Sequence, residues 1–330
     1  MKLYCSITSI SGIAAVTVTQ GHDSDTSSAI IEATTPSVQI GDYIEVDLGY
    51  TTNHQKVFSG YVKSIERRVP TNTYIVTAYD VMIRAIDYFI VADDPLNPLS
   101  YQNISAEDLV ADLFSKAGLT SFTYDTTYFV FGINESFDIN LVSPLDYSNT
   151  IASLITWHLW ADENGTIHFE NRKPYVMTGD TSQPGDTVDE RAISTSYTLN
   201  DDATGLLYAE SEKDLRNKVV VYGNNGVSAV AQATSPYEPS GFYKATVLVA
   251  PNVIDDVATA QKTADYNLNL LNRLTYSISA TVAGDPSLRA RQIINVNSTK
   301  LGITNTHYYV FGCTHNFSKS GYINELELRK

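Results

Sequence analysis

Hydrophobic and polar residues alternate with a period of two over much of the chain, which predicts strands. The clearest block covers residues 37–80. After Gly41 and Asp42, apolar residues stand at every second position of its first strand: Ile44, Val46 and Leu48. Two further strands, VFSGYVKSIERRV and TYIVTAYD, follow after short polar turns. Three adjacent strands joined in this way predict an antiparallel meander.

A similar pattern closes the chain over residues 291–329, as strand, loop, long strand, short turn and strand. The local wording is also alike, with TTNHQKVFSG at 51–60 and TNTHYYVFG at 304–312. Such a weak internal repeat predicts two related β units near the two ends of the chain, with other material between them. Chance similarity between two meanders is the alternative.

Between the two meanders the pattern changes to a helical period. SAEDLVADLFSKAGL, residues 105–119, begins with a capping signal at Ser105, has one apolar face and ends at Gly118. SNTIASLITWHL predicts a second helix, about 148–159, and WADENGTIHFENR predicts a hairpin with a tight turn. These elements indicate a small mixed α/β domain.

The pattern returns to strands after residues 180–190, which contain no apolar run. KVVVYGNNGVSAVAQA predicts a hairpin, and a helix at 258–272 leads into the last strands. We therefore predict a mainly β protein with α+β insertions. Its domains would be a β domain at 1–94, the mixed α/β domain at 95–180, and a second β domain at 181–330 that carries the 258–272 helix.

Charge and composition narrow the possible functions. The chain has 330 residues, enough for two or three cores, and a net charge of −15. Such a surface repels nucleic-acid backbones, so sequence-specific DNA or RNA binding is disfavoured, and solubility is the plainest reason for the charge. Cys5 and Cys313 are too few for a disulfide framework, and the sequence leaves their roles open. No stretch approaches the length of a transmembrane helix, so we expect no membrane insertion.

The stretch HYYVFGCTHNFSKSGYINELEL, residues 307–328, contains three metal-ligand side chains: His307, Cys313 and His315. All three are odd-numbered, so in a regular strand they would share one face. Three aromatic residues, Tyr309, Phe311 and Phe317, would share that face too, which favours a buried strand. A zinc site also needs further ligands, and no Cys-x-x-Cys or His-Glu-x-x-His motif accompanies these residues. We predict a strand here rather than a metal site.

Other candidate chemistry is weaker. Four possible metal ligands surround the predicted central hairpin: His158, Glu163, His168 and Glu170. Polar residues on the wet face of a hairpin explain them equally well. Three carboxylate pairs lie in predicted loops: Asp23 with Asp25, Asp93 with Asp94, and Asp201 with Asp202. Trp157 and Trp160 have helical spacing, which favours a core role over a sugar platform. We predict no catalytic, cofactor-binding or metal-binding residues, and no enzymatic activity.

Five blocks occur in an order that resembles the phage tail baseplate hub family, the late-control or tail-hub proteins of contractile and long-tailed phages and related injection systems. The blocks are IGDYIEVDLGY with VFSGYVKSIER; SAEDLVADLFSKAGL; the 148–159 helix with ADENGTIHFENR; DLRNKVVVYGN; and the 258–272 helix with VAGDPSLRARQIINVNS and THYYVFGCTHNFSKSGYINELELR. They cover nearly the whole chain. One departure is RARQIINV, where the family often has Gly-Asp before the strand, and we expect it to affect only a turn.

The resemblance implies two tail-tube-like β-barrel domains with the small mixed domain beside them. Three copies would form a ring whose six barrels meet a sixfold tail tube or distal tail protein. The other face would bind a threefold spike or central fibre, and the tape measure protein is a further candidate partner. The 258–272 helix would lie on a barrel and help to contact its neighbour. The implied location is the virion baseplate, after assembly in the host cytoplasm.

The same resemblance implies that DNA passes through the lumen of the ring, where an acidic wall would let it slide. Two alternatives remain open. A tail-tip enzyme that degrades cell wall would need a catalytic constellation that the sequence does not display. A carbohydrate-binding β protein of the tail tip would differ from a hub because it is not expected to form a stable trimer.

Overall fold

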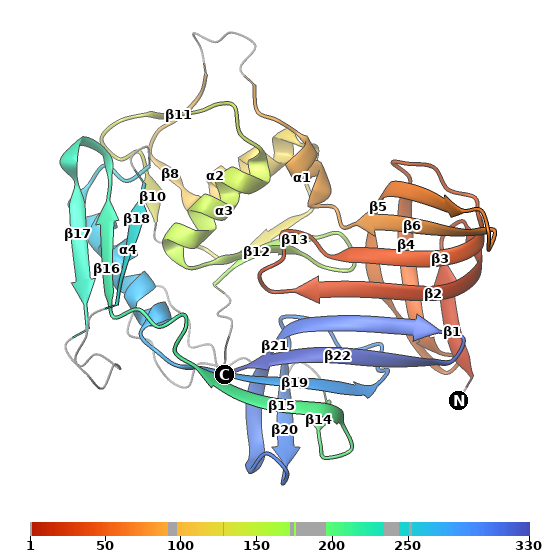
Figure 1. The fold of residues 1–330 in the computed structure, drawn as a ribbon. Coiled ribbons are helices and arrows are strands. Elements are labelled where there is room, and N and C mark those ends of the chain that lie inside the picture. The colour runs from red at the N-terminus through yellow and green to blue at the C-terminus, as the bar shows by residue number, and fades with distance from the viewer. Residues whose placement is uncertain are drawn as a thin grey trace.

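The computed structural model describes residues 2–91, 98–127, 129–171, 175, 196–233, 244–250 and 253–330. These residues form a 12-stranded sheet, four smaller sheets and a few helices, which confirms the predicted mainly β fold class (Figure 1). Among them, no helix is both long enough and apolar enough to cross a membrane.

The first β unit contains six strands of the large sheet: β1 (Leu3–Ile7), β2 (Ile10–Gly21), β3 (Ser28–Pro36), β4 (Tyr43–Tyr50), β5 (Asn53–Arg68) and β6 (Thr73–Tyr79). Their order in the sheet is β1-β4-β5-β6-β3-β2, and a pairing between β1 and β2 closes this order on itself. Every strand contributes alternate apolar side chains to one interior, among them Val18, Ile31 and Val46. The alternation predicted from the sequence therefore builds the core of this unit.

The second β unit also contains six strands: β14 (Thr198–Leu199), β15 (Thr204–Ser211), β19 (Thr275–Ala283), β20 (Ile293–Ser298), β21 (Ile303–Ser318) and β22 (Gly321–Arg329). Their order is β14-β20-β21-β22-β19-β15. When the strands of each unit are numbered in chain order, both units read 1-4-5-6-3-2. One difference is that β14 runs parallel to β20, whereas β1 runs antiparallel to β4.

The correspondence extends to single residues of the long strands. The β5–β6 pairing has a bulge between Val62 and Ser64, and the β21–β22 pairing has one between Val310 and Gly312. The backbone amides of Val62 and Val310 donate to the carbonyls of Asp42 and Gln292, the residues just before β4 and β20, at 2.9 and 2.8 Å. The internal repeat predicted from the sequence is confirmed.

The two units are joined into one sheet by an antiparallel pairing of β2 with the C-terminal half of β21. The pairing runs from Ala15 opposite Ser318 to Gly21 opposite Gly312. In Figure 1 the red and orange first unit and the blue second unit accordingly lie side by side. Strands from the two ends of the chain thus form the joint between the units.

The bulge in β21 corrects one prediction. An extra residue in a strand shifts the alternation of side chains between the two faces. Tyr308 and Cys313 therefore share the core of the second unit, whereas Tyr309 and Phe311 pack in a separate cluster. The expectation that odd-numbered residues from His307 to the end of the strand share one face is wrong.

The remaining elements form a lateral region beside the sheet. Its first part contains α1 (Ile83–Asp87), β7 (Leu99–Tyr101), β8 (Ile104–Ser105), α2 (Ala106–Lys116), β9 (Phe122–Tyr124), β10 (Val130–Phe131), β11 (Phe137–Ile139), α3 (Pro144–Ile155), β12 (His158–Ala161) and β13 (Ile167–Glu170). Its second part contains β16 (Lys218–Tyr222), the short 3-10 helix η1 (Asn224–Gly226), β17 (Ser228–Gln232), β18 (Ala245–Val249) and α4 (Val257–Leu271). The two parts share one hydrophobic core.

Helix α2 forms with the expected capping signal, whereas helix α3 ends earlier than predicted. The side chain of Ser105 caps α2 by accepting from the amide of Asp108, as predicted. Helix α3 ends at Ile155, because Thr156 adopts a left-handed conformation with φ of 59°. The predicted continuation to residue 159 is therefore wrong, and Trp157 and Trp160 do not lie on one helix.

Among the described elements, helix α4 makes its main contacts with β16, β17 and α3, which all belong to the lateral region. Its buried residues Ala260, Ala264 and Tyr266 belong to the core of the lateral region. The expectation that this helix lies on a barrel is therefore wrong. The local pattern predicted the helix itself, but only tertiary packing decides which sheet it covers.

Candidate functional site

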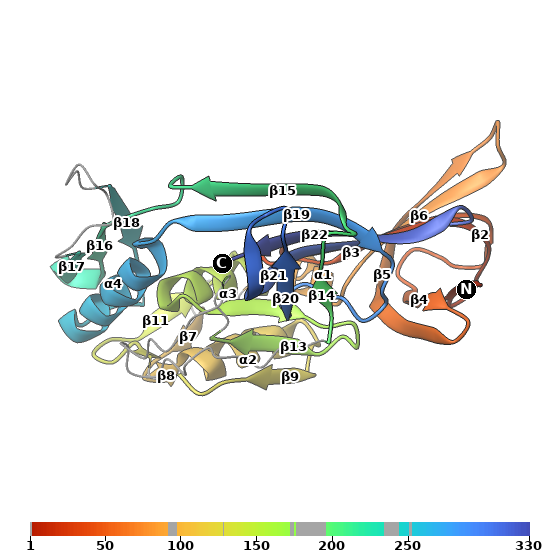
Figure 2. The ribbon, with the colours of Figure 1, turned by 90° about the horizontal axis from the view of Figure 1, so that it is seen from below.

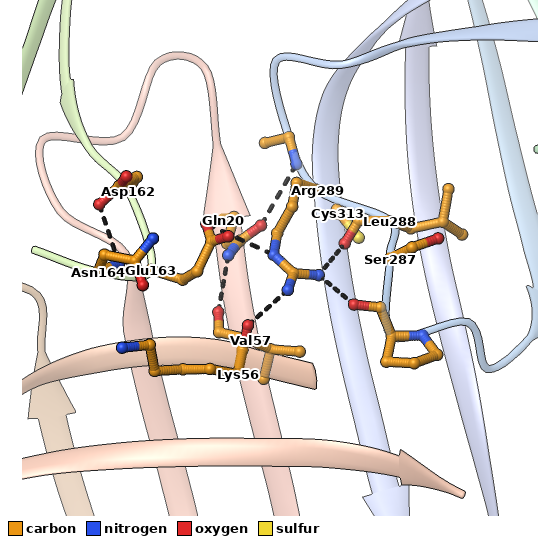
Figure 3. Close-up of polar contacts among 12 residues, drawn as sticks. Gln20, Lys56, Val57, Asp162, Glu163, Asn164, Ser287, Leu288, Arg289 and Cys313 are labelled. Atoms are coloured by element: carbon orange, nitrogen blue, oxygen red, sulfur yellow. Dashed lines mark hydrogen bonds and ion pairs between the residues drawn. The ribbon is translucent and has the colours of Figure 1, made fainter. Parts of the chain in front are cut away.

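A loop before β20 carries Arg289, which joins three parts of the molecule (Figure 3). Its guanidinium donates to the carbonyls of Pro286 and Leu288 at 2.5 and 2.7 Å, and to the carbonyl of Lys56 in β5 at 2.6 Å. Its Nε lies 3.7 Å from a carboxylate oxygen of Glu163 in the lateral region. Arg289 is only 8 % exposed, so these contacts are made away from solvent. A single side chain thus contacts both β units and the lateral region. We call the contacts of Arg289 and of its neighbour Arg291 the arginine joint.

The side chain of Gln20 in β2 also supports the arginine joint. Its amide nitrogen donates to the carbonyl of Val57 at 3.0 Å, and its amide oxygen accepts from the amide of Ala290 at 3.3 Å. The side chain is buried and uses both ends of its amide. It fixes the position of the arginine loop relative to the first β unit.

Arg291, two residues further along, reaches the other side of the joint. Its guanidinium donates to the carbonyl of Gly21 at 2.6 Å and to Nε2 of His158 at 2.9 Å, and lies 4.9 Å from the ring centroid of Trp160. His158 in turn stacks on His22, with 4.0 Å between ring centroids. Arg291 is buried, and its backbone is left-handed, with φ of 71°. The expectation that RARQIINV affects only a turn is wrong, because Arg291 connects β2 with the lateral region.

The connection from the first unit to the lateral region contains a buried carboxyl group. Asp80 accepts hydrogen bonds from the amides of Ser27 and Met82 at 2.6 and 3.0 Å. Burial raises its pKa to about 7 even though these two hydrogen bonds favour the charged form. This carboxyl group therefore orders the chain where β6 leads into α1.

The Cys313 and His315 pair forms a closed hydrogen-bonded pocket with Tyr322 and Asn324. Nδ1 of His315 lies 2.7 Å from the hydroxyl of Tyr322 and 2.9 Å from the amide nitrogen of Asn324, and Nε2 lies 3.5 Å from the sulfur of Cys313. Burial raises the pKa of the Cys313 thiol to about 12 and lowers the pKa of His315 to about 3. A neutral thiol is a poor metal ligand. His307 lies on the exposed part of β21 opposite Asn295, and the structure does not bring it to this pocket.

The four candidate ligands around the central hairpin separate into different contacts. His168 lies 3.0 Å from Glu170 and 3.4 Å from Asp162. Burial opposes its charge, but the hydrogen bonds to these carboxylates raise the pKa of His168 to about 9. Glu163 faces Arg289, and His158 faces Arg291. Among the residues that the structure describes, no group of three or more His, Cys, Asp or Glu side chains could hold a metal ion.

The predicted carboxylate pairs serve local roles where they are described. Asp201 accepts from the hydroxyls of Ser298 and Thr299, both at 2.5 Å, and these hydrogen bonds lower its pKa to about 2. Asp25 accepts from the side chain of Asn149 at 2.9 Å, which ties the β2–β3 connection to α3. Asp93 and Asp94 lie outside the described residues.

The two tryptophans also have structural contacts. Trp157 is buried and packs 5.1 Å from the ring of Phe169, as the core interpretation predicts. Trp160 stacks on His168 at 4.3 Å between ring centroids. The sequence analysis missed the roles of Arg289 and Arg291. The pair of arginines in one loop of an acidic chain marks the place, but it does not indicate which distant residues they contact.

Solved structures of tail proteins share this fold. A tail protein from Neisseria meningitidis is 14% identical, covers 100% of this chain and 97% of its own, and has a TM-score of 0.68. The 43 kDa tail protein of prophage MuSo2 from Shewanella oneidensis is 13% identical, with coverage of 99% and 97% and a TM-score of 0.67. A type VI secretion component of E. coli, itself similar in structure to two bacteriophage tail proteins, is 11% identical, with coverage of 98% and 76% and a TM-score of 0.56.

The chain therefore has the fold of phage tail proteins, and the resemblance found in its five sequence blocks is confirmed. A family model described as YQBQ-like matches residues 16–329. The chain belongs to the YQBQ-like family. No curated protein sequence matches it.

Proposed function

We propose that this protein is a structural part of a phage tail baseplate, namely a hub whose three copies form a ring between a sixfold tail tube and a threefold spike or central fibre. The observation that carries the proposal is the repeated 1-4-5-6-3-2 strand order, with a bulge at the same point of both long strands. Three chains with two such units each supply six similar positions around a ring. The other face of such a ring keeps threefold symmetry.

The arginine joint supports this role because it fixes the two units relative to each other. Arg289 and Arg291 contact β5, the end of β2 and the lateral region from one loop. A ring that carries load during DNA ejection needs adjacent units held at a constant angle. Hydrogen bonds from a charged donor are stronger than those between neutral groups, so they suit a contact that must hold the two units in place.

The partners follow from the same proposal. They are two further copies of this chain, a tail tube or distal tail protein, a spike or central fibre protein, and the tape measure protein. The protein would act in the virion tail after assembly in the host cytoplasm. The net charge of −15 suits a conduit through which DNA passes without sequence-specific contact. A neutral or positive lumen in the assembled ring would contradict that last point.

We keep the three predicted domains as part of the proposal: 1–94, 95–180 and 181–330. Strands β16–β18 and helix α4 share the core of the lateral region. In the ring, this part of the third domain would therefore lie with the mixed α/β domain beside the six β units. Limited proteolysis followed by mass spectrometry tests the boundaries, because cleavage is expected near residues 94 and 180.

Mass photometry of the purified full chain over a range of concentrations tests the stoichiometry. We expect a trimer that becomes more populated as concentration rises. A stable dimer or tetramer would contradict the ring. A separate assay with purified cell wall tests the alternative of a tail-tip enzyme, because sustained cleavage would contradict a purely structural role.

A further inference from the structure

Among the strand edges of the large sheet that have no strand partner in the described residues, two match each other in the repeat. The first belongs to β15, which pairs only with β19 and has seven exposed residues out of eight. The second belongs to the part of β5 beyond Val62, which pairs with β6 on one side, whereas its pairing with β4 stops at Tyr61. Figure 2 shows this part of β5 in a β5–β6 hairpin that extends away from the molecule. Long exposed edges are a liability that proteins normally cover.

The joint inside the chain shows what covers the corresponding edges. In the repeat, β21 corresponds to β5, and β2 corresponds to β15. The C-terminal half of β21 is covered by β2. The corresponding half of β5 lacks such a neighbour, and β15 lacks such a target. The two free edges are thus the two halves of the same joint.

We propose that β15 of one copy pairs antiparallel with the C-terminal half of β5 in the next copy, and so repeats between chains the joint that β2 and β21 make within each chain. This inference rests on the proposed ring and identifies the surface that closes it. The two edges belong to different strands, so the contact is head-to-tail. Such a contact continues from copy to copy until rotation closes the ring.

The repeat also fixes which residues face each other. On one side, Glu66 corresponds to Thr314, because each lies four positions after the valine that precedes the bulge, Val62 or Val310.

On the other side, Ala209 corresponds to Thr19. Ala209 lies opposite Ser277, and Thr19 lies opposite Ser28. Ser277 and Ser28 are equivalent, because Ser277 pairs with the last residue of β22 and Ser28 pairs with the last residue of β6.

Within the chain, Thr19 lies opposite Thr314. The same register between copies places Ala209 opposite Glu66, and Glu210 opposite Ile65. A shift by one residue would turn every side chain to the other face, so the register is a sharp prediction.

The charges of the two edges are complementary. Residues 63–68 of β5 carry three basic side chains and one acidic side chain. Residues 207–214, in β15 and just after it, carry three acidic side chains and one basic side chain. In the predicted register Glu210 lies on the same face as Arg67, at the diagonal position where cross-strand pairs interact. A second copy of this chain therefore fits the edge in charge as well as in backbone pairing.

Disulfide cross-linking of the full chain tests the register. The variant Ala209→Cys with Glu66→Cys is made in a Cys5→Ser background, because Cys5 is only partly buried, while Cys313 is buried and is kept. Cysteines on directly opposite strand residues have the short Cβ separation that a disulfide needs. We expect intermolecular disulfides under mild oxidation. The control Ala209→Cys with Arg67→Cys places one cysteine on the other face and is expected to stay uncross-linked.

The outcomes separate this inference from the proposed function. Trimers by mass photometry without cross-links, or with equal cross-linking of the control, would overturn the strand pairing and leave the ring intact. Cross-linked ladders without a closed trimer would support the pairing and contradict the threefold ring. Absence of both association and cross-links at high protein concentration would contradict both.

Reversing the charges of exposed residues at the two edges tests the association between copies independently of cross-linking. Glu210→Lys with Glu212→Lys is expected to weaken association about tenfold, because like charges then face each other. Adding Arg67→Glu, on the same face as residue 210, is expected to restore part of the association. Equal association of all these variants would count against the pairing.

Discussion

The two β units share their strand order but differ in the loop before the fourth strand. In the first unit this loop holds Gly41, with φ of 93° and open space around it, and Gln39, which is exposed. In the second unit, the matching places hold Arg291 and Arg289, both buried. The backbone geometry is conserved, since both loops keep a left-handed residue at the same point. The repeat thus determines the backbone of both loops, whereas only the side chains of the second loop make the contacts that join the units.

The units also differ where the long strand is covered. Cys313 and His315 lie in the part of β21 that pairs with β2 and are buried, whereas their counterparts in β5, Ile65 and Arg67, are half-buried and exposed. His315 is enclosed by Tyr322 and Asn324 of β22, so its surroundings decide that this face of the strand becomes core in the second unit. This exposed half of β5 is the edge that we propose pairs with the next copy.

The largest effect is expected when the arginine joint is broken. Arg289→Met removes three hydrogen bonds from a charged donor and should lower the free energy of unfolding by about 3–5 kcal/mol. The matched change Gln39→Met in the first unit should alter it by less than about 0.5 kcal/mol. Chemical denaturation measures both. Similar values for the two variants would mean that the loops do not differ in role.

A smaller loss is expected for Arg291→Gly. The change relieves the left-handed backbone but removes the hydrogen bonds to Gly21 and His158. We expect a net loss of about 2–3 kcal/mol in the free energy of unfolding. A neutral or stabilising result in thermal and chemical unfolding would show that backbone strain outweighs the joint.

The buried histidine of the second unit should make stability depend on pH. The folded state holds the pKa of His315 at about 3, because burial disfavours its charged form. The unfolded chain takes up a proton near its ordinary pKa of about 6.5, so stability is lost as pH falls below that value. Between pH 6.5 and 5 the loss should reach about 2 kcal/mol. His315→Gln should flatten this slope in urea titrations at several pH values, and an unchanged slope would contradict the assignment.

The smallest expected effect is that of Gly41→Ala. A Cβ at this position meets no atom within 4 Å, so only the positive φ of 93° opposes the change. We expect a loss of about 1 kcal/mol in the free energy of unfolding. A loss as large as that of Arg291→Gly would mean that backbone strain alone accounts for the sensitivity of both loops.

Local signals predicted the parts of the fold that local forces decide. The alternation of Ile44, Val46 and Leu48 and the cap at Ser105 are contained in a few neighbouring residues, and both formed as predicted. The face of Cys313 was mispredicted because a bulge depends on strand pairing. The role of Arg289 was not predictable, because its contacts Lys56 and Glu163 are far away in the sequence.

Electron cryomicroscopy of the assembled oligomer tests most directly whether the two units act as equivalents. We predict a threefold ring in which both units of every chain stand around one lumen at nearly equal angles and give six similar positions. A ring in which only one unit of each chain lines the lumen, or an oligomer with twofold symmetry, would contradict this arrangement.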